Sequence, residues 1–81
     1  MIRYYKHMEL TIRFENEDVK VRGDVDKSTG FIFYTCTFEN KDKIVLSGFD
    51  GNVLKFANHM GKNEMPDLDK LIECVNDSLF Q

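Results

Sequence analysis

Apolar and polar residues alternate along the first part of the chain. Over residues 2–15, the even positions are apolar except for Lys6, and the odd positions are polar or charged except for Tyr5. Successive side chains of a strand point to opposite sides of a sheet, so this alternation predicts a strand with one buried face. A helix would scatter the same apolar side chains around its circumference. We therefore predict the first strand at residues 2–15.

Three further strands are predicted before residue 50. Asn16-Glu17 offers a two-residue turn that pairs Phe14 with Val19 and puts both side chains on the buried face. The later segments are rich in β-branched and aromatic residues, which suit a sheet. Every connection is too short for a crossover helix, so we expect an antiparallel meander. The predicted ranges are 18–25, 31–38 and 43–49.

After residue 50 the spacing of apolar residues becomes helical. This spacing predicts a helix at 51–60, with Asp50 as its N-cap and Gly61 at its end. An alternative interpretation makes Asp50-Gly51 a hairpin turn between two strands. We favour the helix because Ala57-Asn58-His59 suits a strand poorly. The apolar residues on its face are Val53, Leu54, Phe56, Ala57 and Met60.

A second helix is predicted at 67–80, where Asp67 can act as the N-cap and apolar residues recur at helical spacing. The expected fold class is α+β, a four-stranded antiparallel meander followed by two helices packed on one face, in a single domain covering residues 1–81. The expected core consists of Met8, Leu10, Ile12, Phe14, Val19, Val21, Val25, Ile32, Cys36, Phe38, Ile44, Leu46, Val53, Phe56, Leu68, Leu71, Ile72 and Val75.

The amino-acid composition indicates a small folded domain rather than a disordered, membrane-spanning or secreted protein. The 81 residues are 42% hydrophobic and 31% charged, with a net charge of −3. This apolar content argues against a disordered tail. No apolar run approaches the ~20 residues of a membrane span, and the first residues do not resemble a signal peptide. Cys36 and Cys74 could form at most one disulfide, whereas small secreted domains usually carry more. We expect a soluble cytoplasmic protein.

Catalytic and metal-binding patterns are missing from the sequence. The serines lie outside any Gly-x-Ser-x-Gly turn, and no Cys or His residues have the spacing of a zinc site. His7 is expected on the exposed strand face and His59 near a helix end. Cys36 and Cys74 are expected to be buried and inert. We therefore predict that the protein is not an enzyme and holds no metal or cofactor.

One candidate binding surface is the solvent side of the predicted sheet. If Ile32 points inward, the aromatic residues on either side of it point outward, and an exposed aromatic patch indicates an interface with a partner protein or a homodimer. A register shifted by one residue would instead bury Phe31 and Phe33 and expose Ile32 and Tyr34. The candidate residues are Tyr5, Phe31, Phe33, Val45 and Phe49.

The segment from Thr29 to Tyr34 resembles the RNP1 segment of RNA-recognition motifs. This resemblance implies single-stranded RNA binding, with bases stacked on Phe31 and Phe33. The basic first position of RNP1 is Thr29 here, and no helix is expected between the first two strands. The acidic net charge also argues against nucleic-acid binding.

A second candidate surface is the acidic C-terminal segment. Over residues 63–81, five carboxylates against Lys70 leave a charge of −4. Such a charge is commonly a solvated helix face, but a rigid acidic helix also suits docking to a basic surface, such as a groove for nucleic acid. The candidate residues on the predicted helix are Asp67, Asp69, Glu73 and Asp77.

The predicted layout resembles type I-F anti-CRISPR proteins. The resemblance covers an antiparallel sheet, a helix opened by Phe49-Asp50, a break at Gly61, and a closing helix with Leu68 and Val75. It implies a non-catalytic phage or mobile-element inhibitor that occludes a basic or nucleic-acid-binding surface of a host defence protein. No functional residue is carried over from that family, because no motif aligns with this chain.

Two other functions remain open from the sequence. One is a small-molecule-binding or sponge protein, with the ligand held at a dimer cleft by Arg13, Arg22, Tyr5 and Phe33. The other is a single-stranded RNA binder through Phe31 and Phe33. The leading prediction is the protein-binding module, which would use the aromatic sheet face, the acidic helix or both.

Overall fold

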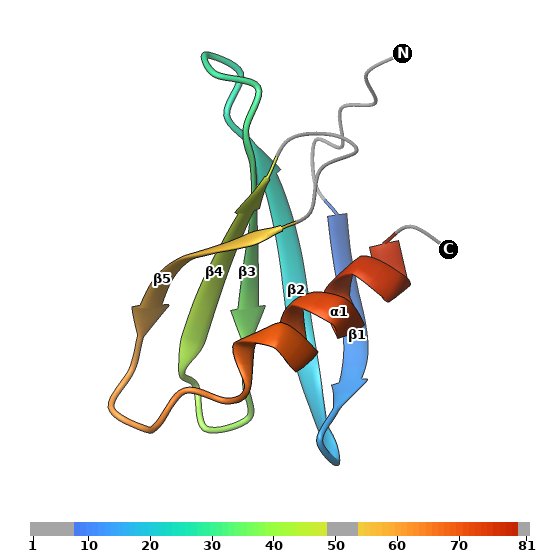
Figure 1. Cartoon of the computed structure of the whole chain (residues 1–81), viewed down its shortest axis with the longest axis vertical. Coiled ribbons are helices and arrows are strands. Elements are labelled where there is room, and N and C mark those ends of the chain that lie inside the picture. The colour runs from blue at the N-terminus through green and yellow to red at the C-terminus, as the bar shows by residue number, and fades with distance from the viewer. Residues whose placement is uncertain (1–7, 49–53, 80–81) are drawn as a thin grey trace.

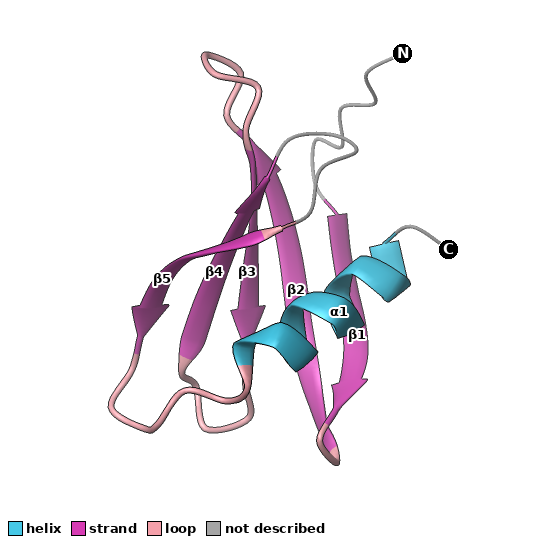
Figure 2. Cartoon of the chain, viewed as in Figure 1, coloured by secondary structure: helices cyan, strands magenta, loops and turns pink. Residues whose placement is uncertain are grey.

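The computed structural model describes residues 8–48 and 54–79. They form a five-stranded antiparallel sheet and a C-terminal helix, α1, which lies across one face of the sheet (Figures 1 and 2). The strands follow one another in sequence order across the sheet, so each pairs with its neighbour in the chain. The elements are β1 (Met8–Phe14), β2 (Glu17–Val25), β3 (Ile32–Thr37), β4 (Lys43–Gly48), β5 (Lys55–Met60) and α1 (Leu68–Leu79).

The structure corrects the predicted fold class. The predicted helix at 51–60 is wrong, because Lys55–Met60 is a fifth strand paired with β4. The alternative interpretation, two strands on either side of residue 50, is therefore the right one, although the connection at 49–53 lies outside the described residues. The prediction of a C-terminal helix at 67–80 agrees with α1 in its described part. The fold is thus five strands and one helix, rather than four strands and two.

The first hairpin has the predicted faces but a different turn. Glu15 and Asn16, with φ values of 47° and 68°, form the two-residue loop, and Phe14 pairs with Glu17 rather than Val19. Positive φ at both loop residues matches the right-handed twist of the strands, and Asn tolerates it well. The observed register differs from the predicted one by two residues, and the side of the sheet to which a side chain points also repeats every two residues. The apolar residues therefore remain on the predicted face.

The buried face of the sheet carries most of the predicted core. Ile12 and Phe14 from β1 meet Val19 and Val21 from β2, and Ile44 and Leu46 are fully enclosed on β4. On β3, Ile32 and Tyr34 are both buried, so the register that exposes them is wrong. Tyr34 and Leu54 belong to the core although they were not predicted there, whereas Phe56, predicted as core, is 43% exposed. Partly buried residues at the rim of this core are Leu10, Val25, Leu68, Ile72, Cys74 and Leu79.

Helix α1 covers the buried face through one apolar side. Leu71 and Val75 are fully buried against the strands, and the helix contacts β1. Asp67 is the N-cap, as predicted: its Oδ1 accepts a hydrogen bond of 3.3 Å from the backbone N–H of Lys70. Near the middle of α1, the Cys74 thiol donates a hydrogen bond of 3.6 Å to the backbone carbonyl of Arg13. These contacts hold α1 on one face of the sheet, and no described helix lies on the opposite face.

The end of β5 is tied to the turn between β3 and β4. The Asp42 carboxylate accepts a hydrogen bond of 3.1 Å from the backbone N–H of Asn63 and lies 3.9 Å from Nε2 of His59. Gly61 passes so close that a Cβ there would overlap this carboxylate. His59 is therefore a strand residue that faces Asp42, and the prediction of a helix-end histidine is wrong.

Candidate functional site

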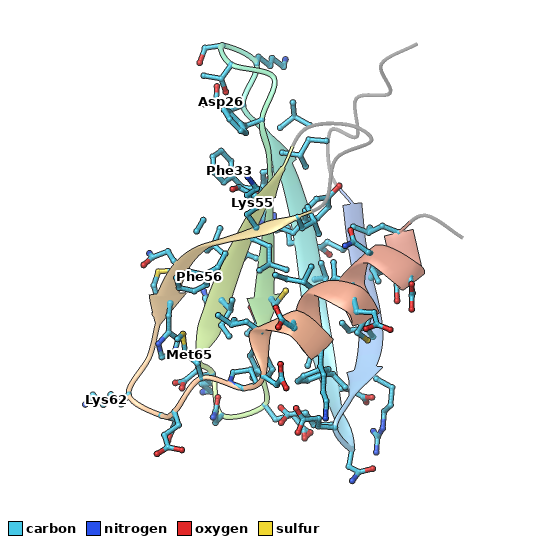
Figure 3. The ribbon with its side chains drawn as sticks, in the orientation of Figure 1. Asp26, Phe33, Lys55, Phe56, Lys62 and Met65 are labelled. Carbon is cyan, nitrogen blue, oxygen red and sulfur yellow. The ribbon has the colours of Figure 1, made fainter. Side chains whose placement is uncertain are left out.

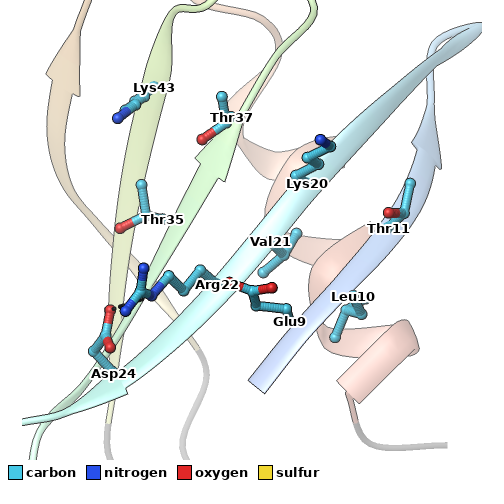
Figure 4. A pocket seen from close by; sticks show the side chains of 10 residues that line it. All are labelled: Glu9, Leu10, Thr11, Lys20, Val21, Arg22, Asp24, Thr35, Thr37 and Lys43. Atoms are coloured by element: carbon cyan, nitrogen blue, oxygen red, sulfur yellow. Dashed lines mark ion pairs between the residues drawn. The ribbon is translucent and has the colours of Figure 1, made fainter. Parts of the chain in front are cut away.

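The face of the sheet opposite α1, called the outer face below, is the side that the helix leaves uncovered (Figure 4). Strand pairing arranges its side chains in rows that cross the sheet. One row runs from Thr11 through Lys20 and Thr37 to Lys43, one residue on each of the first four strands. The next row contains Glu9, Arg22, Thr35, Val45 and Asn58. Because neighbouring strands lie about 4.8 Å apart, these rows form a regular polar surface.

The outer face holds an open depression of about 730 Å³ across β1 to β4. Hydroxyl groups and charged groups alternate around it, and Figure 4 shows their side chains pointing away from α1. This lining can hydrogen-bond to a partner but offers little enclosure for an apolar small molecule. The outer-face residues around it are Glu9, Thr11, Lys20, Arg22, Asp24, Thr35, Thr37 and Lys43.

Two of the cations on this face are already paired. Arg13 Nη1 lies 3.0 Å from Oδ1 of Asp18, and Arg22 Nε lies 3.6 Å from Oδ2 of Asp24. Lys20 and Lys43, which flank Thr37 in one row, have no ion pair within the described part of the chain. The two ammonium groups are therefore free to pair with carboxylates of a partner. This pair is not apparent from the sequence, because Lys20 and Lys43 align only once the strand register is known.

The predicted aromatic surface is present in part. Phe33 lies on the outer face, paired with Asp24 and Ser47, and is partly exposed. The Phe31 ring packs beside it, with ring centroids 6.3 Å apart and a tilt of 36°. Val45 also faces outward and is half-buried. Tyr5 and Phe49, predicted to extend the patch, lie outside the described residues.

The predicted acidic surface also exists. Asp69, Glu73 and Asp77 are all exposed and recur every four residues, which places them along one side of α1, away from Leu71 and Val75. Asp67 is exposed as well, but its carboxylate is used in capping the helix. The acidic helix therefore lies on one side of the sheet, and the lysines of the outer face lie on the other.

The structure shows the surroundings of four side chains that carry a thiol or a hydroxyl, those of Cys36, Cys74, Ser28 and Ser78. Burial, and secondarily Cys74, raises the pKa of the Cys36 thiol to about 12, and burial followed by Asp77 and Glu73 raises the pKa of Cys74. Both thiols are thus held in their less reactive protonated form. The hydroxyl of Ser28 donates to Asp26, and that of Ser78 donates to the carbonyl of Cys74.

The described ranges lack two further features, a metal-binding cluster and a membrane-spanning helix. No group of three or more His, Cys, Asp or Glu side chains within residues 8–48 and 54–79 converges to hold a metal ion. In the same ranges no helix has the length and apolar content that crossing a membrane requires.

Comparison of the chain with family models, curated proteins and solved structures finds no match. The resemblance to type I-F anti-CRISPR proteins depended on a sheet followed by two helices. Residues 55–60 form a strand instead, so the layout that carried the resemblance is not the layout of this chain.

Proposed function

We propose that this chain is a non-catalytic protein-binding module whose outer face contacts an acidic surface of a partner protein. The observation that carries the proposal is the row through Lys20, Thr37 and Lys43. This row presents two cations that form no ion pair with another described residue, beside an open depression. Carboxylates of a partner would pair with these lysines and accept hydrogen bonds from the threonine hydroxyls.

The aromatic pair supplies the apolar part of the same surface. Phe31 and Phe33 stand next to each other and are only partly buried, so contact with a partner would remove apolar area from water. Protein interfaces commonly combine an aromatic anchor with a polar, charged rim. The outer face has both components on one sheet, with the row of Arg22 and Thr35 between the lysine row and Phe33.

The proposal is tested by comparative affinity capture from cells that naturally contain the protein, with mass spectrometry of what is retained. We expect the wild type to retain a specific acidic protein, and Lys20→Glu/Lys43→Glu and Phe33→Ser each to lose that protein. Asp69→Lys/Asp77→Lys is the matched control, since it reverses the same number of charges on the opposite side of the sheet. Urea unfolding of each variant shows whether the fold is retained.

Three outcomes would contradict the proposal. One is retention of the same protein by Lys20→Glu/Lys43→Glu, and a second is its loss in the Asp69→Lys/Asp77→Lys control, which would favour the acidic helix. The third is tight, salt-dependent binding of a short fluorescent single-stranded RNA that Phe33→Ser abolishes. That result would assign the aromatic pair to RNA instead.

A further inference from the structure

Strand β1 is an edge of the sheet that neither a proline nor a bulge interrupts. It has a hydrogen-bonded neighbour, β2, on one side only within the described part of the chain. It contains neither a proline nor a register shift over Met8–Phe14. The opposite edge, β5, differs: its pairing with β4 shifts by one residue near Val45, which bends a strand away from a new neighbour. Of the two edges, β1 is therefore the one prepared to accept another strand.

The hairpin geometry determines which backbone groups point outward from β1. Phe14 and Glu17 flank a two-residue loop and so form a hydrogen-bonded pair, after which bonded and non-bonded pairs alternate. Glu9, Thr11 and Arg13 therefore direct their N–H and C=O groups away from β2. The Cys74 thiol lies 3.6 Å from the Arg13 carbonyl oxygen and donates to it, which agrees with a carbonyl that points away from β2. A carbonyl oxygen has two lone pairs, so this weak contact leaves room for a second donor.

The side chains of β1 are complementary to themselves in one antiparallel register. With a two-fold axis at Thr11, Glu9 of one chain stands opposite Arg13 of the other, and Leu10 stands opposite Ile12. The charged pair lies on the outer face and the apolar pair on the face that α1 covers. Axes at Glu9 or Arg13 oppose like charges, and an axis at Ile12 brings Glu9 against Glu15. Charge complementarity thus selects the axis at Thr11.

We propose that a second copy of this chain binds along β1, so that two sheets join edge to edge about a two-fold axis at Thr11. The backbone groups of Thr11 form two hydrogen bonds across the axis, and each Glu9–Arg13 pair forms two more. Leu10, partly buried in one copy, is covered by Ile12 of the other. The Arg13 side chain, now 66% exposed beside Asp18, can reach Glu9 of the second copy without leaving water. This edge borders the outer-face depression, because Glu9 and Thr11 also line it, whereas Lys20, Lys43 and Phe33 of the proposed function lie on other strands.

Sedimentation velocity over a range of concentrations at low salt tests the proposal. We expect the wild type to reach twice its mass of 9.5 kDa. Glu9→Arg and Arg13→Glu each oppose like charges at both symmetric pairs, and each should raise the dimer dissociation constant by roughly tenfold or more. An equimolar mixture of the two variants restores opposite charges across the interface. It should form heterodimers, and the double variant Glu9→Arg/Arg13→Glu should form homodimers again.

Cross-linking gives a second, independent readout. In a Cys74→Ser background, Thr11→Cys places two thiols on the axis, where paired strands bring Cα atoms to about 5.5 Å, within disulfide range. Oxidation should therefore join two chains. Thr35→Cys, on the same face but on the interior strand β3, should not cross-link. Lys20→Glu and Phe33→Ser are the sedimentation controls, and both should dimerise as the wild type does.

Several results would overturn the edge-to-edge dimer. They are a wild type that stays monomeric at every concentration, a Glu9→Arg variant that dimerises normally, and a mixture of folded variants that fails to associate. Loss of the dimer in Phe33→Ser would move the interface to the outer face. Loss of the dimer in Phe33→Ser would not decide whether the outer face binds a partner protein, because the affinity capture tests that separately.

Discussion

Asp26 shows at the scale of one residue how this chain builds a turn. Its Oδ1 accepts hydrogen bonds from the backbone N–H of Ser28 at 2.9 Å and from the Ser28 hydroxyl at 2.6 Å. Its backbone carbonyl accepts from the N–H of Gly30, which has a φ of 80°. The Asp, Ser and Gly residues of this segment each suit a turn for a known reason, so the sequence is compatible with one here. Only the structure shows which oxygen of Asp26 accepts from which donor.

Replacing Ser28 by Ala should raise the pKa of Asp26. The hydrogen bonds from Ser28 are the main cause that holds this pKa below its ordinary value of 3.8. A lowered pKa stabilises the fold at pH values above the unfolded pKa, and the stabilisation is lost as the pH falls through the folded value. Carboxyl ¹³C NMR titration of Asp26 should show the shift. An unchanged titration curve in Ser28→Ala would show that the Ser28 hydroxyl does not lower the pKa of Asp26.

At the scale of single elements, alternation predicted the described part of β1, while residues 2–7 of that predicted strand lie outside the described residues. Turn position and β-branched or aromatic composition predicted β2, β3 and β4 to within one residue at each end. Strand β5 was missed for two physical reasons. It is an edge strand with mostly exposed side chains, so its residues do not divide into buried and exposed sets. Its register shift also makes Phe56 and His59 face the same side, three residues apart, which is the spacing of a helix. Figure 3 shows Phe56 on β5, where the sequence analysis expected a core helix.

Replacing Gly61 by Ala should loosen the end of β5. The new Cβ would overlap the Asp42 carboxylate, which the N–H of Asn63 holds in place. Displacing it breaks that contact, so we expect a loss of about 1 kcal/mol in the free energy of unfolding, measured with urea. In an Asp42→Ala background the overlap is gone, and the same substitution should cost much less. If Gly61→Ala lowers the free energy of unfolding equally in both backgrounds, the loss does not come from overlap with the Asp42 carboxylate.

At the scale of the whole molecule, the two candidate surfaces follow from a two-layer arrangement. The one helix of the described ranges covers one side of the five-stranded sheet, and no other described element covers the opposite side. The sequence located the acidic residues of α1 and the outward Phe33 correctly, because helical and strand periodicity determine which side a residue faces. It could not align Lys20 with Lys43, nor the β1 edge with a second copy. Both depend on register between strands, which periodicity alone does not fix.

In this two-layer arrangement, replacing Leu71 tests whether the helix and the sheet unfold together. Leu71 is fully buried between α1 and the sheet, and its replacement by Ala should cost about 2–5 kcal/mol. The total stability expected for 81 residues is on the order of 4–12 kcal/mol. Because α1 supplies the cover for the buried face, we expect helix and sheet signals to be lost together in thermal unfolding followed by circular dichroism. Leu79→Ala, at the partly exposed end of α1, is the milder control. Loss of the helix signal at a lower temperature than the sheet signal would show instead that the sheet keeps its structure without α1.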